Sequence, residues 1–218
     1  ILAQLRRQHL VPATFTRATR RHSRHLRRHR RHTATSATRR HPQTTTPTST
    51  SSTTPPLLPL TVTDATACVG GDTLHFATDF QHVHAIERDT THYQMLQNNL
   101  GVYPDRSTRV TVHHGDALAI LPTLRQEVVF MDPPWGGKSY KNKKQLQLTL
   151  SGKTLPEVVK QLWDDRKRAG TRCVVFKMPR NAGFGAFRKG VREMVGKGVE
   201  VRRVDLKESR MAVFVVGW

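Results

Sequence analysis

The sequence predicts an α/β fold in which helices cover both faces of a mostly parallel sheet. Three observations predict it. From residue 57 to the C-terminus, short apolar runs alternate with segments of helical apolar spacing. Turn residues separate these runs, and acidic residues follow several of them. Because the carboxyl ends of parallel strands meet at one edge of a sheet, we expect a ligand site at that edge.

The first predicted unit is a strand, a glycine turn and a helix. Residues 62–67 have the character of a strand end, and a glycine turn follows at 70–71. The apolar residues Leu74, Ala77 and Phe80 then recur with helical spacing. A bare pair of glycines lacks the full spacing of a dinucleotide-binding loop, so this turn alone predicts little about a ligand.

The second unit is a strand over 82–87 followed by a helix over 90–100, which is predicted to end at Gly101. The apolar face of this helix consists of Tyr93, Leu96 and Leu100. The remaining strands are predicted over 109–113, 127–131 and 172–178, with 199–204 and 211–218 as a closing pair. The pattern therefore contains enough strands for one sheet and one domain, over residues 57–218.

The most informative segment is the run from Asp132 to Gly137, which follows the strand over 127–131. Pro133 and Pro134 cannot continue a central strand, because neither has the N–H group that the sheet requires. The chain must leave the sheet here, and the rigid turn holds the Asp132 carboxylate and the Pro133 carbonyl as fixed acceptors. Trp135 offers a flat aromatic face beside them.

Acceptors next to an aromatic face suit the exocyclic amine of a nucleobase. The lone pair of such an amine is delocalised into the ring, so the amine is a poor nucleophile. Accepting its two N–H hydrogens turns the lone pair towards an electrophile, and stacking keeps the base in line. Asp132, Pro133 and Trp135 are therefore the predicted catalytic residues.

Acidic residues at two further strand ends extend this site. Glu87 ends the second strand, where a carboxylate can accept the hydroxyl groups of a ribose, and Asp116 follows the third. A glycine turn, a strand-end acid, a Gly-Asp pair and an Asp-Pro-Pro-aromatic segment, in this order, are expected of a methyltransferase that uses S-adenosylmethionine.

The chain resembles a specific family at this point. Segments 64–73, 85–89, 115–116, 132–140 and 177–181 resemble the trimethylguanosine synthase family of RNA cap guanine-N2 methyltransferases, in particular the versions of large DNA viruses and protists. The resemblance implies a class I methyltransferase (Rossmann-like) sheet of seven strands, with the last two forming an antiparallel closing pair. It also implies S-adenosylmethionine as cofactor and capped RNA as partner.

The resemblance assigns roles to individual residues. Asp64 and Gly70 would border the methionine part of the cofactor, Glu87 would hold its ribose and Asp116 would lie beside its adenine. Trp135 would stack on the positively charged 7-methylguanine. The residues expected around the cap phosphates are Lys138, Lys141, Lys143, Lys144, Arg180 and Asn181. A solvated surface is the alternative for the lysine cluster. No metal site is expected.

Residues 1–56 differ from the rest of the chain. They hold 12 arginines and no lysine, aspartate or glutamate, within a formal net charge of +20 for the whole sequence. Arg, His, Thr, Ser and Pro dominate, so this tail is predicted to be disordered. Three interpretations stay open: an arm that binds RNA phosphates, an organelle transit peptide, or an extension without a selected role.

Two other functions also stay open. The chain could methylate guanine N2 or adenine N6 at an internal base of RNA or DNA, or it could be an inactive RNA-binding module with this fold. No apolar run is long enough to span a membrane. We expect a monomer, located in the nucleus or nucleolus of a cell or in the host cell of a virus, with an organelle as the alternative that the tail suggests.

Overall fold

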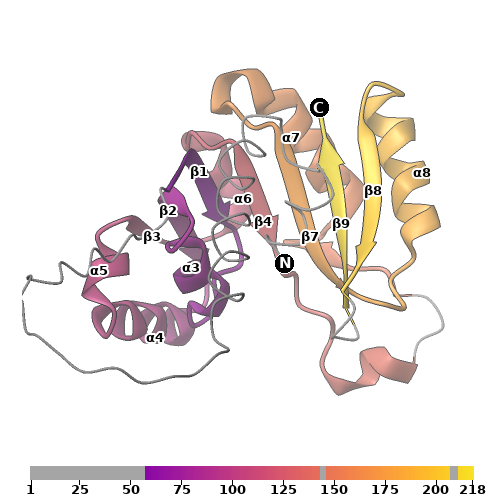
Figure 1. Ribbon diagram of the computed structural model, residues 1–218. Coiled ribbons are helices and arrows are strands. Elements are labelled where there is room, and N and C mark those ends of the chain that lie inside the picture. The colour runs from indigo at the N-terminus through magenta and orange to yellow at the C-terminus, as the bar shows by residue number, and fades with distance from the viewer. Residues whose placement is uncertain (1–56, 143–145, 207–210) are drawn as a thin grey trace, which may run out of the picture.

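The computed structural model describes residues 57–142, 146–206 and 211–218, and Figure 1 shows their arrangement. The described residues form a seven-stranded sheet of order β3-β2-β1-β4-β7-β9-β8 and a two-stranded sheet of β5 and β6. The predicted α/β class and the seven-stranded sheet are confirmed. The prediction of a disordered tail concerns residues 1–56, which lie outside the described residues.

The five strands β3, β2, β1, β4 and β7 run parallel, and β9 pairs antiparallel with both β7 and β8. The strands are β1 (Leu58–Asp64), β2 (Phe80–Glu87), β3 (Val110–His114), β4 (Val128–Met131), β7 (Cys173–Pro179), β8 (Glu200–Asp205) and β9 (Met211–Gly217). Asp64 is in register with Ala85 on one side and with Phe130 on the other. The chain segments after β1, β2 and β4 therefore leave the sheet at the same edge.

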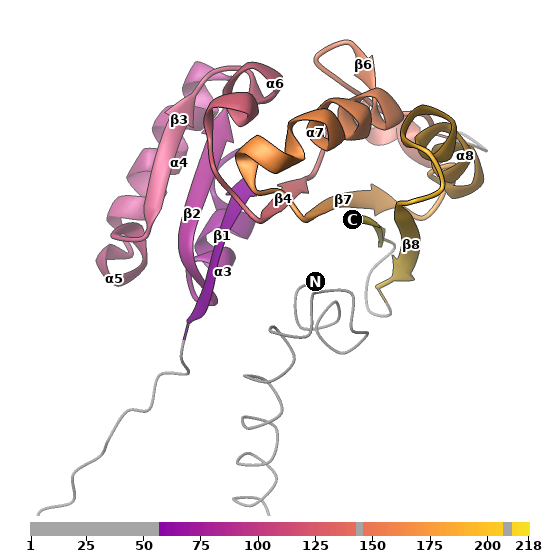
Figure 2. The same cartoon turned by 90° about the horizontal axis from the view of Figure 1, so that it is seen from above.

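Helices connect the parallel strands. They are α3 (Gly71–Phe76), α4 (Thr90–Gly101), α5 (Pro104–Ser107), α6 (Ala117–Ile120), α7 (Leu155–Ala169) and α8 (Phe184–Val195), with short 3-10 helices η1 (Leu121–Thr123) and η2 (Lys138–Asn142). A hairpin of β5 (Thr149–Leu150) and β6 (Lys153–Thr154) precedes α7. Figure 2 shows α7 and α8 on the same side of the sheet.

Apolar side chains fill both faces of the sheet. On one face, α7 and α8 pack on the central strands, and Phe187 of α8 lies 5.2 Å from the ring of Phe214. On the other face, Phe76 of α3 meets Phe130 edge to face at 5.0 Å. Burial of these rings removes a large apolar area from water, which is the main force that holds the layers together.

One predicted helix is shorter than its apolar spacing suggested. Residues Leu74, Ala77 and Phe80 were expected on one helix, but α3 ends at Phe76 and Phe80 begins β2. The backbone N–H of Asp79 donates to the carbonyl of Phe76, which closes a turn between the two elements. Three apolar residues in a seven-residue window are compatible with one continuous helix. They are equally compatible with a helix end followed by a strand.

The described residues contain no helix that combines the length and the apolar character needed to cross a membrane.

Candidate active site

A cavity of about 1070 Å³ lies at the carboxyl edge of the parallel strands. Residues that follow β1, β2, β3 and β4 line it, together with the β5–β6 hairpin. The glycine turn, the acidic end of β2 and the Asp-Pro-Pro-Trp segment therefore face one common space. This volume is at the upper end of the range of small-molecule sites, so it has room for more than one ligand.

Asp64 ends β1 and is fully buried, with no exposed surface. Its Oδ2 accepts a hydrogen bond from Thr73 Oγ1 at 2.6 Å. Its Oδ1 is buried and makes no hydrogen bond of normal geometry with a described residue, although the backbone N–H of Thr66 lies close enough to the carboxyl to lower its pKa slightly. Burial raises the pKa of Asp64 to about 7, and the carboxylates of Asp72 and Asp132 add to the shift. Asp64 therefore shapes the floor of the cavity, while its carboxylate itself has no exposed surface.

Gly70 makes the turn between β1 and α3. Its φ of 95° lies in the left-handed region, which a residue without a Cβ atom adopts at no steric cost. A Cβ atom here would also lie 2.6 Å from Leu96 Cδ1. The turn after β1 therefore depends on glycine for its shape and for the close approach of α4.

Glu87 ends β2 and lines the cavity. Its Oε2 accepts from the backbone N–H of Cys68 at 2.8 Å, and its Oε1 accepts from that of Asp89 at 2.7 Å. Each carboxylate oxygen retains a second lone pair. The two amides thus hold the carboxylate in a fixed orientation in which it can still accept two hydroxyl groups.

Asp116 follows β3 and is the N-cap of α6, where its Oδ1 accepts from the backbone N–H of Leu118 at 2.8 Å. Its Oδ2 accepts from Ser151 Oγ of the β5–β6 hairpin. Burial alone would raise the pKa of Asp116, but the hydrogen bonds from Ser151 and Leu118 keep it below its usual value. The neighbours Gly115 and Ala117 line the cavity, while the Asp116 side chain connects the hairpin to α6.

The β5–β6 hairpin was not predicted. Ser151 and Gly152 form its turn with φ angles of 49° and 81°, as a two-residue hairpin of type I′ requires. The residues 149–152 line the cavity opposite the strand ends. A Ser-Gly pair between residues of strand character was the signal that could have identified this turn.

Asp132 lies directly after β4, so the two prolines take the chain out of the sheet as predicted. The backbone N–H of Asp132 donates to Thr66 Oγ1 at 2.7 Å, which ties the start of this segment to the turn after β1. Burial raises the pKa of the Asp132 carboxyl, and its contacts with Lys177 oppose the shift without cancelling it. Pro133 and Pro134 also line the cavity.

Trp135 is half-buried and lines the same cavity. Its ring meets Tyr140 edge to face, with centroids 5.2 Å apart. Asn181 Nδ2 donates to the carbonyl of Tyr140 at 2.7 Å and so steadies the neighbouring ring. The buried indole N–H of Trp135 makes no hydrogen bond of normal geometry with a described residue, although it lies close enough to Asp132 to lower the pKa of that carboxyl slightly.

Lys177 belongs to this site, and no role was predicted for it. Its Nζ lies 2.9 Å from Oδ2 of Asp132 and 2.9 Å from Oδ2 of Asp72, and 18% of its side chain is exposed. Burial alone would lower the pKa of Lys177, but the two carboxylates hold it above its usual value. The signal was a lysine inside β7, a strand whose other residues are all buried.

The other residues expected at the cap phosphates lie in different places. Lys141 lines the cavity, and Lys138 is the first residue of η2. Lys143 and Lys144 lie outside the described residues. Arg180 donates from Nη2 to the carbonyl of Leu206 at 3.3 Å. Arg180 and Asn181 are not among the residues that line the cavity; Asn181 acts on it through Tyr140.

No group of three or more His, Cys, Asp or Glu side chains in the described ranges is placed to hold a metal ion.

Comparison with known proteins gives a family and several relatives. The chain matches the family described as RNA cap guanine-N2 methyltransferase over residues 60–217. An uncharacterized protein of Acanthamoeba polyphaga mimivirus is 34% identical over 131 residues, which make up 59% of this chain and 49% of that protein. The trimethylguanosine synthase of Schizosaccharomyces pombe is 39% identical over 90 residues, which make up 39% of this chain and 37% of that protein. The chain thus spans about half or less of the length of these relatives.

A solved structure agrees with the fold. The human methyltransferase 10 domain containing protein has a TM-score of 0.54 to this chain at 14% identity, and the match covers 73% of this chain and 71% of that one. At this identity the likeness supports the fold alone. Because the family match extends over almost every residue of the sheet and its cavity, the chain belongs to the RNA cap guanine-N2 methyltransferase family.

Proposed function

We propose that this chain transfers a methyl group from S-adenosylmethionine to the exocyclic N2 amine of a 7-methylguanosine RNA cap. The observation that carries the proposal is the single cavity shared by Glu87, Asp132 and Trp135. A cofactor-binding half and a base-binding half are thus contiguous, as direct transfer between two bound molecules requires.

The cavity fits the cofactor in two respects. Glu87 is held by two backbone amides and keeps lone pairs for the two hydroxyl groups of a ribose. Asp64 and the turn after β1 line the end of the cavity where the methionine part of the cofactor would lie. Gly70 does not itself line the cavity; it shapes the turn whose neighbouring residues Val69 and Gly71 do.

The base-binding half is suited to an aromatic amine. The Asp132 carboxylate and the Pro133 carbonyl would accept the two amine hydrogens and turn the nitrogen lone pair towards the methyl group. The face of Trp135 would stack on the guanine, and the positive charge of a 7-methylguanine adds a cation-π attraction of roughly 1 to 2 kcal/mol when desolvated. Lys141 is available for the phosphates of the cap.

The cofactor supplies an electrophilic methyl group on a sulfonium sulfur. Transfer would join the amine nitrogen to the methyl carbon, and the electron pair of the broken carbon–sulfur bond would stay on sulfur. The nitrogen then loses one proton, which Asp132 or water can accept. Asp132 therefore acts first by orienting the amine and afterwards as a possible proton acceptor, both of which require its ionised form.

A substrate panel tests the proposal. The protein is incubated with labelled S-adenosylmethionine and one of three substrates: a 7-methylguanosine cap dinucleotide, the same dinucleotide without the 7-methyl group, or an uncapped RNA. Label in the first product alone is the expected result. Label in the uncapped RNA alone would show that the substrate is an internal base and not the cap. Cofactor binding without label in any product would indicate an inactive RNA-binding module.

A further inference from the structure

We infer that α8 and the segment that follows it carry a second contact for RNA. This contact holds the phosphates of the RNA strand downstream of the cap. The contact consists of Arg188, Arg192 and Lys197, called the basic stripe below. The inference rests on the proposed function, since capped RNA supplies the phosphates. It concerns a surface outside the cavity, because none of these three residues lines the candidate active site.

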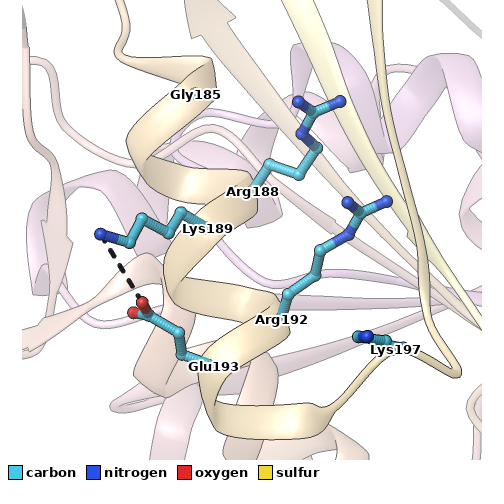
Figure 3. A pocket seen from close by; sticks show the side chains of 6 residues that line it. All are labelled: Gly185, Arg188, Lys189, Arg192, Glu193 and Lys197. Carbon is cyan, nitrogen blue, oxygen red and sulfur yellow. Dashed lines mark ion pairs between the residues drawn. The ribbon is translucent and has the colours of Figure 1, made fainter.

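The three side chains share one side of α8. Arg188 and Arg192 are four residues apart, about one helical turn, and Lys197 follows the end of the helix. Figure 3 shows both guanidinium groups extending to the same side of the helix, with Lys197 below them. Lys189 and Glu193 project from the other side and form an ion pair, with 3.8 Å between Nζ and Oε1.

A cavity of about 550 Å³ opens beside the stripe. Its lining contains four basic residues and one acidic residue: Gly185, Arg188, Lys189, Arg192, Glu193 and Lys197. The only acid in this lining is already paired with Lys189. The space next to the stripe is therefore strongly positive, which favours a polyanion.

The fold itself does not satisfy these charges. No described carboxylate lies within 4.0 Å of Arg188, Arg192 or Lys197. Like charges one turn apart on a helix repel each other, so the pair of arginines destabilises α8. The guanidinium of Arg188 does rest 5.7 Å from the ring centroid of Phe184, which limits the freedom of the side chain without neutralising it.

The position of the stripe connects it to the active site. β7 ends at Pro179, at the same sheet edge as β4, and α8 starts five residues later. Asn181, between them, supports the loop that places Trp135 and Tyr140 in the cavity. α8 then runs away from this edge for 12 residues, about 18 Å. A strand of RNA that leaves a cap at Trp135 can follow α8 and meet the stripe with successive phosphates.

Phosphate is the chemistry that these residues recognise best. Arginine presents a planar donor fork that can bind phosphate oxygens in pairs, and such contacts do not depend on base identity. We therefore expect the stripe to strengthen binding of RNA of any sequence.

The test replaces Arg188, Arg192 and Lys197 together with glutamine. The matched control replaces Arg125, Lys167 and Arg172 with glutamine, which removes the same charge from exposed positions outside the stripe and outside its cavity. Filter binding measures the affinity for a single-stranded RNA with a 7-methylguanosine cap over a salt series. Methyl transfer to the free cap dinucleotide is measured in parallel, and thermal melting checks the folding of each variant.

The stripe variant should bind the long RNA roughly tenfold more weakly at low salt, and the slope of log affinity against log salt should fall by about 2, at about 0.7 for each lost phosphate contact. Its turnover on the cap dinucleotide should equal that of the wild type. The control should match the wild type in every measurement. An unchanged salt slope in a folded stripe variant overturns the inference. Failure of the wild type to methylate the dinucleotide overturns the proposed function instead, and leaves the salt slopes readable.

Discussion

The ammonium group of Lys177 lies 2.9 Å from Oδ2 of Asp132, the carboxylate that directly follows β4. The same ammonium contacts Asp72 at the start of α3. One buried cation thus joins three elements of the site, namely β7, α3 and the Asp-Pro-Pro-Trp segment. Since Asp132 must be ionised to accept amine hydrogens, its two charged neighbours determine the pH range over which it can act.

Replacing Lys177 with methionine should reduce kcat by roughly ten- to hundredfold, because a hydrogen bond between charged groups is lost beside the reacting amine. Loss of the cation also raises the pKa of Asp132 further, so the acid limb of the pH–rate profile should move to higher pH. Lys177→Arg keeps the charge and should restore part of the activity. The measurement is kcat against pH on the cap dinucleotide.

Asp72→Asn is the matched variant, and it should shift the acid limb in the opposite direction. The Asp72 charge raises the pKa of Asp132, so its removal should move the acid limb to lower pH. A purely structural role for Lys177 would instead lower the melting temperature and leave both pH profiles where the wild type has them. If the acid limb moved in the same direction in Lys177→Met and in Asp72→Asn, the electrostatic explanation would likewise be contradicted.

Glu87→Ala should weaken S-adenosylmethionine binding by roughly ten- to hundredfold, since a carboxylate that accepts two ribose hydroxyls is lost. Calorimetry with the cofactor alone measures this without any turnover. Glu200→Ala, an exposed position on β8, is the control and should keep wild-type affinity. Equal cofactor affinity in the Glu87 variant and the wild type would remove Glu87 from the binding site.

The sheet could be predicted because its central strands are unusual. All four residues of β4 are buried and apolar, and β7 begins with four buried apolar residues before Lys177 interrupts the run, so both strands stand out in the sequence. Pro133 and Pro134 mark the end of β4 without any tertiary information. Phe80 was placed wrongly because a turn of only a few residues separates α3 from β2, and local spacing does not identify such a short turn.

The contacts within the site depend on topology, which local patterns do not show. Lys177 and Asp72 are 105 residues apart, and they meet because β7 pairs with β4 while β1, which leads into α3, pairs with β4 on its other side. Ser151 reaches Asp116 across a separation of 35 residues, through a hairpin with strands of two residues each. Strands this short leave no periodic signal in a sequence.

Asp64 predicts a dependence of stability on pH. Its pKa is about 7 in the folded chain against 3.8 for the free side chain. The folded protein therefore holds a proton that the unfolded chain releases between these values. This contribution to stability is complete below pH 4 and disappears as the pH rises through 7. In the wild type this group lowers the free energy of unfolding by up to about 4 kcal/mol over that interval, at 1.36 kcal/mol for each pKa unit. Asp64→Asn should abolish this decrease.

His84 makes stability depend on pH in the opposite direction to Asp64. Burial lowers its pKa to about 4 from 6.5, and His82 and His113 add to the shift. The unfolded chain therefore binds the extra proton, so stability falls as the pH decreases from 6.5 to 4. Denaturant unfolding from pH 4 to 8 should show that Asp64→Asn and His84→Gln change the slope in opposite directions. Parallel curves for both variants and the wild type would contradict these assignments.

Trp135 has two neighbours that make different demands on it, the cavity on one side and Tyr140 with the apolar core on the other. Trp135→Phe should keep part of the activity, because a smaller aromatic face still stacks on the base. Trp135→Ala should lose most of the activity and also some stability, since its half-buried ring packs against the core. The discriminating readout is therefore selectivity between caps, measured as the ratio of kcat/KM values on the 7-methylated and unmethylated dinucleotides.

A stacking role requires that this ratio fall when the ring is removed, because only the methylated base carries the positive charge that an aromatic face attracts. Trp163 is the matched control, a half-buried tryptophan whose ring packs edge to face on Trp218, 5.5 Å away, and which does not line the cavity. Trp163→Ala should lower the melting temperature and leave the cap ratio at its wild-type value. If Trp135→Ala instead reduced the rates on both caps by the same factor, the ring would act through packing alone, and the selectivity between the caps would have to come from other residues.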